Sequence, residues 1–294
     1  MGMDTEENDI NQGRPETGPE KRDCMNEHGQ ETNHREQETT GRSSVPIIFA
    51  HRGASGTRPE NTMSAFRRAV ELGATGIETD VQLSADGEPV LIHDETLTRT
   101  AGAPGWVGDK TYEELRGLDA GSWFHPEFMG ERIPHLNELL KLARQWNVAV
   151  NIELKNTVRA YEGLEEKVIE AVREHGMERQ VIFSSFNHYS LALCKKLAPE
   201  IRTGILYAEG LYRPWEYAKT LGADALHAYD PAVRADWVSE ARAAGADYHP
   251  FTVNEEGRLR ELLGMGVAGI ITDYPDRVAR LLNERRMAGT VTSK

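Results

Sequence analysis

Residues 136–154 read LNELLKLARQWNVAVNIEL, and this stretch contains the unit from which the fold is built. Leucine recurs at helical spacing over 136–145, and the largely apolar run 148–154 is typical of a buried strand. The same pairing returns along the chain, with further helices expected at 164–174, 190–197, 214–221, 235–244, 255–265 and 276–286 and strands at 181–185, 203–207, 225–228, 248–253 and 269–272. Strands that alternate with such helices indicate a parallel sheet, and this many repeats predict an α/β fold closed as a TIM (β/α)8 barrel.

Upstream of this repeat, the chain supplies three more strands and one more helix. The runs 45–50, 76–83 and 89–93 have strand character, and Asn61-Thr62 precedes a helix over 63–72. This makes nine candidate strands, one more than a barrel of eight needs. Asp86-Gly87 marks a tight turn, so a hairpin or an abrupt return joins 76–83 to 89–93. The surplus strand is expected in this pair or among the short late strands.

Two segments depart from the alternating pattern. Residues 95–134 hold six glycines and three prolines among aromatic residues, with one short helix expected near 112–118. A loop of this length is usually functional or a small subdomain, so we interpret it as an insertion after the third strand. Residues 1–44 contain 11 acidic and 5 basic residues and almost no large apolar side chains, which predicts a disordered N-terminal tail. The barrel domain is therefore expected at 45–287.

The composition narrows the class of protein. The formal net charge is −13, so the chain has no basic footprint for a nucleic acid. No run reaches the ~18 to 20 apolar residues of a membrane span, so we expect no stable membrane insertion. The two cysteines, Cys24 and Cys194, indicate no disulfide framework, and a cytoplasmic enzyme is the expectation. The sequence leaves the oligomeric state undefined.

The polar residues of greatest chemical interest lie at the carboxyl ends of the expected strands, where a TIM barrel has its active site. Side chains at positions i and i+2 of a strand share one face, so Glu78 and Asp80 can point together into the barrel mouth. The same holds for Glu153 and Lys155. Three converging carboxylates repel one another unless a cation joins them, which predicts one divalent ion, Mg²⁺ or Ca²⁺. The alternative is a solvated face with a surface ion pair, but the apolar flanking residues favour the site.

Two histidines and an arginine complete the set at these strand ends. His51 and His93 could each be a core histidine bonded to the backbone, but beside the carboxylates they are interpreted as a general acid and base. Arg52 has a permanent, forked charge suited to phosphate oxygens, and Lys155 adds a second positive charge. The combination predicts metal-assisted cleavage of a phosphate ester.

With these residues assembled, the chain resembles the glycerophosphodiester phosphodiesterases over about residues 46–283. The motifs that carry the resemblance stand in family order: Ala50-His51-Arg52-Gly53, Pro59-Glu60-Asn61-Thr62, Glu78-Thr79-Asp80-Val81, Asp86-Gly87, Val90 to Asp94, Glu153-Leu154-Lys155, Ser184 to Phe186, Thr252-Val253-Asn254 and Thr272-Asp273-Tyr274-Pro275. The resemblance implies a TIM barrel with an insertion after the strand that ends at His93. It also implies roles for seven residues: metal ligation by Glu78, Asp80 and Glu153, acid and base work by His51 and His93, and phosphate contacts from Arg52 and Lys155.

The family reaction implied for this chain hydrolyses a small-molecule glycerophosphodiester to sn-glycerol 3-phosphate and an alcohol. The attacking group is either the glycerol 2-hydroxyl, which passes through a cyclic phosphate, or water. Phe251 stands where family members commonly carry tryptophan, and it is expected to keep an aromatic face for the substrate. His227 either lines the pocket or packs, and Glu60 either lies at the site or caps the next helix.

Two other functions stay open. The alternative enzyme is a lysophospholipase D or a phospholipase that forms a cyclic phosphate. In that case, aromatic residues of the insertion could receive an acyl chain: Trp106, Trp123, Phe124 and Phe128. The alternative from another class is a barrel that has lost catalysis and serves as a binding module. That hypothesis predicts missing key groups, and none is missing.

Overall fold

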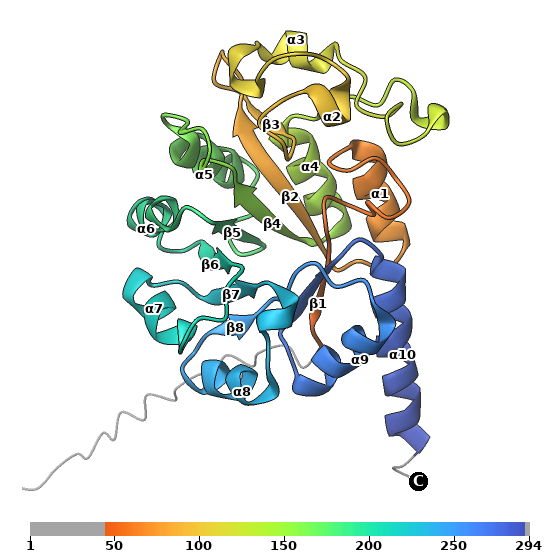
Figure 1. Cartoon of the computed structure of the whole chain (residues 1–294), viewed down its shortest axis with the longest axis vertical. Coiled ribbons are helices and arrows are strands. Elements are labelled where there is room, and N and C mark those ends of the chain that lie inside the picture. The colour runs from red at the N-terminus through yellow and green to blue at the C-terminus, as the bar shows by residue number, and fades with distance from the viewer. Residues whose placement is uncertain (1–44, 292–294) are drawn as a thin grey trace, which may run out of the picture. The chain divides into compact units, whose positions relative to one another are not determined.

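The structure, a computed structural model, describes residues 45–291, with side chains up to residue 288. The predicted disordered tail, residues 1–44, lies outside the described residues. Eight parallel strands form the sheet: β1 (Ile47–Ala50), β2 (Gly76–Leu83), β4 (Ala149–Leu154), β5 (Val181–Ser185), β6 (Arg202–Tyr207), β7 (Ala225–Ala228), β8 (Asp247–Tyr248) and β9 (Gly269–Thr272). Their order is β8-β7-β6-β5-β4-β2-β1-β9, and Figure 1 shows the helices around them. The predicted TIM barrel is confirmed.

The barrel closes between β8 and β9 through single hydrogen bonds, because β8 contributes only two residues to the ladder. The backbone N–H of Ala268 donates to the Tyr248 carbonyl at 3.1 Å, and that of Ile271 donates to the Pro250 carbonyl at 3.0 Å. The opposite side is regular, since β2 and β4 pair over six residues, from Gly76 with Ala149 to Val81 with Leu154. The most continuous part of the sheet therefore lies where the predicted carboxylates are.

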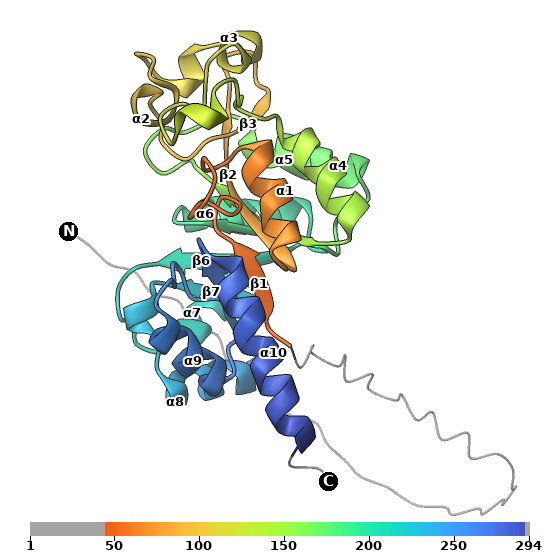
Figure 2. The same ribbon diagram turned by 90° about the vertical axis from the view of Figure 1, so that its right-hand side faces the viewer.

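Eight helices surround the barrel: α1 (Met63–Glu71), α4 (Leu136–Trp146), α5 (Leu164–Glu174), α6 (His188–Leu197), α7 (Pro214–Leu221), α8 (Ala235–Ala243), α9 (Glu256–Met265) and α10 (Pro275–Val291). Their starts follow local signals, as Thr62 illustrates: its Oγ1 accepts the Ala65 N–H at 3.2 Å, which caps α1. α4 buries Leu136, Leu139 and Leu140 on one face, as their helical spacing predicts. Figure 2 shows α1 and α4 side by side on one flank of the sheet.

The surplus strand is β3 (Pro89–Leu91), which lies outside the barrel. β3 runs antiparallel to β2, with Val81 opposite Leu91 and Leu83 opposite Pro89. The hairpin alternative is therefore correct, and β2 pairs directly with β4 inside the barrel. As a result, the chain returns along β2 and delivers His93 to the same mouth that β2 supplies with carboxylates.

The insertion after β3 contains α2 (Thr98–Ala101), η1 (Val107–Asp109), α3 (Tyr112–Arg116) and η2 (Pro126–Phe128). α3 confirms the short helix expected near 112–118. The segment has a small core that is separate from the barrel core and is shared with the end of the hairpin: Val90, Ile92, Leu97, Ala101, Val107, Leu115, Ala120 and Ile133. Figure 1 places it, in yellow, at the end of the barrel where β2 finishes. The insertion is thus a small subdomain at the mouth.

Two histidines lie next to each other inside the barrel. His227 on β7 and His249, just after β8, are both buried, and Nδ1 of His249 lies 3.0 Å from Nε2 of His227. Asn151 Nδ2 approaches Nδ1 of His227 at 3.5 Å. Since no atom of His227 reaches solvent, this histidine packs in the interior and does not line a pocket.

This pair predicts that the free energy of unfolding falls as the pH drops below about 6.5. Burial lowers the pKa of His227 to about 3, and burial beside His227 lowers the pKa of His249 well below its ordinary value. Both imidazoles stay neutral in the folded protein, whereas the unfolded chain takes up protons near pH 6.5. Between pH 6.5 and pH 5 the loss is up to about 2 kcal/mol per histidine, which chemical denaturation at several pH values would measure.

His125 provides the matched control, because its side chain is 61% exposed. In His125→Gln the free energy of unfolding should depend on pH as it does in the wild type. In His227→Gln this dependence should be weaker, whether or not the variant is less stable overall. An identical pH dependence in His227→Gln and the wild type would contradict the assignment.

Candidate active site

Three carboxylates from two neighbouring strands meet at the mouth of the barrel. Glu78 and Asp80 come from β2 and Glu153 from β4, and each offers an oxygen that lies within 4.8 Å of the other two. The parallel register sets Asp80 directly beside Glu153. The prediction that the i and i+2 positions converge is therefore confirmed for this group, which could hold a metal ion.

The electrostatics of the group fit a bound cation. Burial and the neighbouring Asp80 charge raise the pKa of Glu78 to about 8, and the same two causes raise the pKa of Glu153. Burial also acts on Asp80, but Arg52, His93 and Lys155 outweigh it and lower the pKa of Asp80 to about 2. Asp80 Oδ1 is buried without a hydrogen-bond partner among the described residues. A hard divalent ion would satisfy this oxygen and remove the repulsion between the carboxylates.

Two cations flank the carboxylates. Lys155 Nζ lies 3.0 Å from Glu153 Oε1 and 3.8 Å from Asp80 Oδ1, and Arg52 Nε lies 3.3 Å from Asp80 Oδ2. Arg52 also donates from Nη1 to Glu60 Oε1 at 2.8 Å. Glu60 therefore belongs to the site, and the capping role falls to Thr62.

Both predicted histidines are held through Nδ1 by a carboxylate. His51 Nδ1 lies 2.7 Å from Asp273 Oδ1, and His93 Nδ1 lies 2.7 Å from Asp94 Oδ1. Burial lowers the pKa of His51, but the hydrogen bond with Asp273 and the charge of Glu78 outweigh it, so the net shift is upward. Because Nδ1 of each ring is engaged, Nε2 is the nitrogen left for proton transfer.

The groups surround one hollow of about 170 Å³. Seven of the eight predicted site residues line it, and the eighth, Asp80, lies within the carboxylate group: the lining comprises His51, Arg52, Glu78, His93, Asn151, Glu153, Lys155, Phe186, Leu206, Phe251, Thr252 and Ile271. Most of the polar groups come from β2 and β4 and from the residues that follow β1, β3 and β4. The apolar side comes from β6, β9 and the loops after β5 and β8. One half of the mouth is thus charged and the other half apolar.

Sequence reasoning missed the partners that hold the predicted residues. Asp273, directly after β9, accepts from Ser55 Oγ at 2.9 Å and from Asn254 Nδ2 at 2.6 Å in addition to its contact with His51. Asn61 donates from Nδ2 to Asp80 Oδ2 at 2.8 Å. Asp273 and Asn61 stand in motifs that could be quoted from the sequence. Position at a strand end was the signal that could have singled out Asp273.

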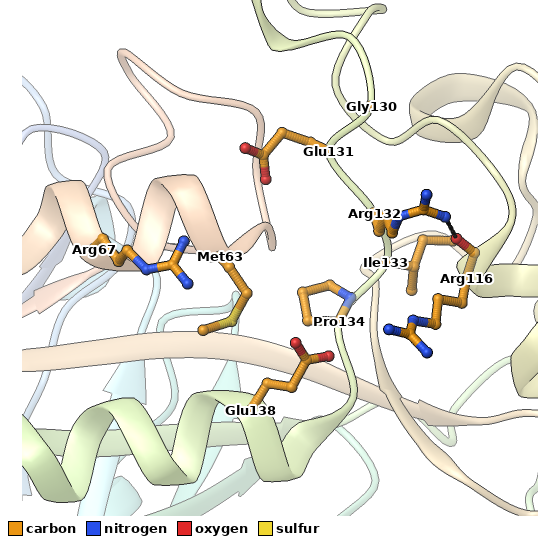
Figure 3. A pocket seen from close by; sticks show the side chains of 9 residues that line it. All are labelled: Met63, Arg67, Arg116, Gly130, Glu131, Arg132, Ile133, Pro134 and Glu138. Carbon is orange, nitrogen blue, oxygen red and sulfur yellow. Dashed lines mark hydrogen bonds between the residues drawn. The ribbon is translucent and has the colours of Figure 1, made fainter.

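A second hollow, of about 230 Å³, lies between α1, the end of the insertion and α4. Figure 3 shows Arg67 and Arg116 on opposite sides of it with Glu138 between them, and Arg132 Nη1 bonds the Arg116 carbonyl at 2.7 Å. Its charged groups have both signs, and most of them are exposed. It contains no histidine, cysteine or convergent carboxylate group. The chemistry therefore belongs to the hollow at the barrel mouth.

The mouth of this barrel supplies the groups that hydrolysis of a phosphate ester needs, so the fold and the site together define the class of protein as a hydrolase of phosphate esters. The sequence model of the glycerophosphoryl diester phosphodiesterase family matches residues 51–277, and the chain belongs to this family. No helix among residues 45–291 is both long and apolar enough to cross a membrane.

Two named relatives and one solved structure match this chain over most of their own length. The chain is 45% identical over 238 residues to a glycerophosphodiester phosphodiesterase of Caldanaerobacter subterraneus subsp. tengcongensis, covering 81% of this chain and 98% of that protein. It is 44% identical over 242 residues to one from Bacillus altitudinis, covering 81% and 99%. The structure of an Oleispira antarctica phosphodiesterase in complex with the product sn-glycerol-3-phosphate matches with a TM-score of 0.73 and 35% identity, covering 81% and 97%.

Proposed function

We propose that this protein hydrolyses glycerophosphodiesters to sn-glycerol 3-phosphate and an alcohol, with the help of one divalent cation, Mg²⁺ or Ca²⁺. The observation that carries the proposal is the hollow at the barrel mouth, which is lined by two carboxylates, two cations and two histidines, with Asp80 completing the carboxylate group. The names of the two relatives and the product bound to the Oleispira antarctica phosphodiesterase support the choice of substrate.

In this proposal Glu78, Asp80 and Glu153 hold the cation. When bound, it supplies positive charge that stabilises the charge on the phosphoryl oxygens during displacement. Arg52 and Lys155 bind the phosphate from the same side as the carboxylates, and their ion pairs with Asp80 and Glu153 fix them there. These residues orient the phosphorus for in-line attack.

The two histidines move the protons. One accepts the proton of the attacking hydroxyl at Nε2 while the new phosphorus–oxygen bond forms, and the other gives its Nε2 proton to the alcohol oxygen as the old bond breaks. The attacking group is a water molecule or the glycerol 2-hydroxyl. In the second case a cyclic phosphate forms first and is hydrolysed afterwards. Asp273 positions His51 and favours its protonated form, since their hydrogen bond contributes to the raised pKa of His51.

The apolar half of the hollow supports a second candidate function, a lysophospholipase D or a phospholipase that forms a cyclic phosphate. Phe186 and Phe251 line the hollow with ring centroids 6.1 Å apart, and Phe186 is 43% exposed. A lipid substrate could lay its apolar part against these rings. The aromatic residues of the insertion do not line the hollow, and Phe124 packs between Trp123 and Phe128. The wall that would receive an acyl chain is therefore Phe186 with Phe251.

A substrate panel separates the two functions. We expect purified protein to cleave glycerophosphocholine and glycerophosphoethanolamine, which gives sn-glycerol 3-phosphate, with a higher kcat/KM than the matching lysophospholipids, whose cleavage gives a lysophosphatidic acid. Release of choline or ethanolamine measures turnover of both substrate classes, and phosphorus NMR detects a cyclic phosphate. Preference for the acylated forms would favour the lipid enzyme. Absence of turnover with every member of the panel would favour a binding module instead.

We also propose the extent and setting of the catalytic unit. Residues 45–287 would suffice for activity, because the family match at 51–277 lies inside this range. A cytoplasmic location is proposed from the cysteine usage, in which Cys194 is buried and free of a disulfide.

A further inference from the structure

One arginine of the insertion connects the two halves of the charged site. Arg99 lies on α2 and forms ion pairs with two carboxylates, those of Asp94 and Glu60. It donates to Asp94 from Nε at 2.7 Å and from Nη2 at 2.9 Å. It donates to Glu60 from Nη1 at 2.8 Å and from Nη2 at 2.7 Å. Both contacts are bidentate, the arrangement that gives arginine its strongest and most directional pairing with carboxylates.

Each of these two carboxylates also bonds one residue of the proposed active site. Asp94 Oδ1 lies 2.7 Å from His93 Nδ1, and Glu60 Oε1 accepts from Arg52 Nη1 at 2.8 Å. We propose that Arg99 is a positioning residue, which fixes the His93 imidazole through Asp94 and the Arg52 guanidinium through Glu60. This inference rests on the proposed function of the site. It gives the insertion a specific role, which is to position two residues of the active site.

The arrangement differs from an ordinary surface ion pair, which contributes little to stability because water competes for both partners. The Arg99 side chain is 42% exposed, but Glu60 and Asp94 are much less so, at 12% and 26%. Hydrogen bonds from Arg99, followed by those with His93, keep the pKa of Asp94 far below its ordinary value. Asp94 is thus a charged acceptor for His93 throughout the physiological pH range.

The insertion in turn holds Arg99 in place. The neighbouring side chains of Leu97, Thr100 and Ala101 are buried in or against the insertion's own core. The Trp123 ring lies 5.6 Å from Arg99 Cζ and is tied by its Nε1 to the Ala120 carbonyl at 2.9 Å. A guanidinium over an aromatic face keeps its hydrogen-bonding edge free. The folded insertion therefore orients the guanidinium group of Arg99 toward the carboxylates of Asp94 and Glu60.

Because Arg99 does not line the hollow, its loss should act through His93 and Arg52. We expect Arg99→Ala to lower kcat/KM by about 10- to 100-fold, the usual effect of removing a residue that orients another. Arg58→Ala is the matched control: Arg58 lies over Phe128 of the insertion at 5.0 Å, and within residues 45–288 its side chain donates only to the Thr57 carbonyl. It should keep the activity of the wild type. Arg99→Lys, which cannot form two bidentate pairs, should recover only part of the loss.

The experiment uses the full chain at saturating divalent metal and compares Arg99→Ala, His93→Ala and the double variant on glycerophosphocholine. We expect Arg99→Ala to cost far less in the His93→Ala background, because residues that act as a unit are not additive. Guanidinium ion added to the buffer should partly restore Arg99→Ala and should not restore His93→Ala. Asp94→Asn, which weakens the route to His93 and leaves the route to Arg52, should show a clear loss that is no larger than that of Arg99→Ala, which keeps the test decisive if Arg99→Ala fails to fold.

Three results would overturn the inference: Arg99→Ala as active as Arg58→Ala, Asp94→Asn as active as the wild type, or an equal cost of Arg99→Ala in both backgrounds. Failure of the proposed function looks different. In that case the wild type releases no glycerol 3-phosphate, or His93→Ala turns over normally.

Discussion

His51→Ala and His93→Ala are each expected to lower kcat by about 10²- to 10⁴-fold, with much smaller changes in KM. Each imidazole is held at Nδ1 by a carboxylate at 2.7 Å, which leaves Nε2 to transfer the proton that the reaction needs. Alanine removes the proton carrier, whereas the groups proposed to bind phosphate, Arg52 and Lys155, stay in place. Steady-state release of glycerol 3-phosphate from glycerophosphocholine measures the effect.

A substrate with a nitrophenyl leaving group distinguishes the two histidines. The nitrophenolate leaves without a proton, so the variant that lacks the general acid should recover most of its activity on this substrate. The variant that lacks the general base should stay slow on both substrates. His125→Ala, an exposed histidine outside the site, is the control. Near-normal turnover of both His51→Ala and His93→Ala would refute the acid and base assignment.

The carboxylates and their placement could be predicted because they follow local rules. The strand period of two sets Glu78 and Asp80 on one face, and the polarity of a TIM barrel sets that face at the mouth. The position of Glu153 beside Asp80 then follows from parallel pairing of β2 with β4. Each step needs only the sequence of a short segment and the knowledge that the barrel closes.

The long-range contacts that hold the site together could not be predicted in this way. The contact between His51 and Asp273 joins residues 222 positions apart, and that between Arg99 and Glu60 joins residues 39 positions apart. Whether Asp273 meets His51 depends on the pairing of β1 with β9, and whether Glu60 meets Arg99 depends on the path of the insertion. Neither of these can be predicted from the periodicity of a short segment. The hairpin of β3 was ambiguous for a related reason, since a short apolar run suits a barrel strand and a return strand equally.

Removal of the divalent cation is expected to abolish turnover, and addition of Mg²⁺ or Ca²⁺ to restore it. Without the cation, the buried group of Glu78, Asp80 and Glu153 is left with mutual repulsion, and protonation relieves it. The phosphate then meets a site that lacks the positive charge of the cation. Activity before and after complete chelation, followed by titration with each metal, measures the effect and identifies the preferred ion.

The same carboxylates predict how metal affinity depends on pH. Burial and Asp80 raise the pKa of Glu78 to about 8, so below that pH the cation must displace a proton from this group. The association constant should therefore rise with pH, by up to about tenfold per unit below pH 8, and level off above it. Calorimetric titration at several pH values measures this slope.

Asp80→Asn tests the site directly, because the amide keeps the shape of the carboxylate and removes the charge that the cation needs. We expect it to lose metal-dependent activity and the rise in melting temperature that the ion gives the wild type. Glu71→Gln, an exposed carboxylate on α1 that pairs with Arg68, should keep both. Activity that survives complete removal of divalent metal, or undiminished metal binding by Asp80→Asn, would exclude these carboxylates as the metal site. Loss of both responses in Asp80→Asn alone would place the cation at Asp80, whose buried Oδ1 has no hydrogen-bond partner among the described residues.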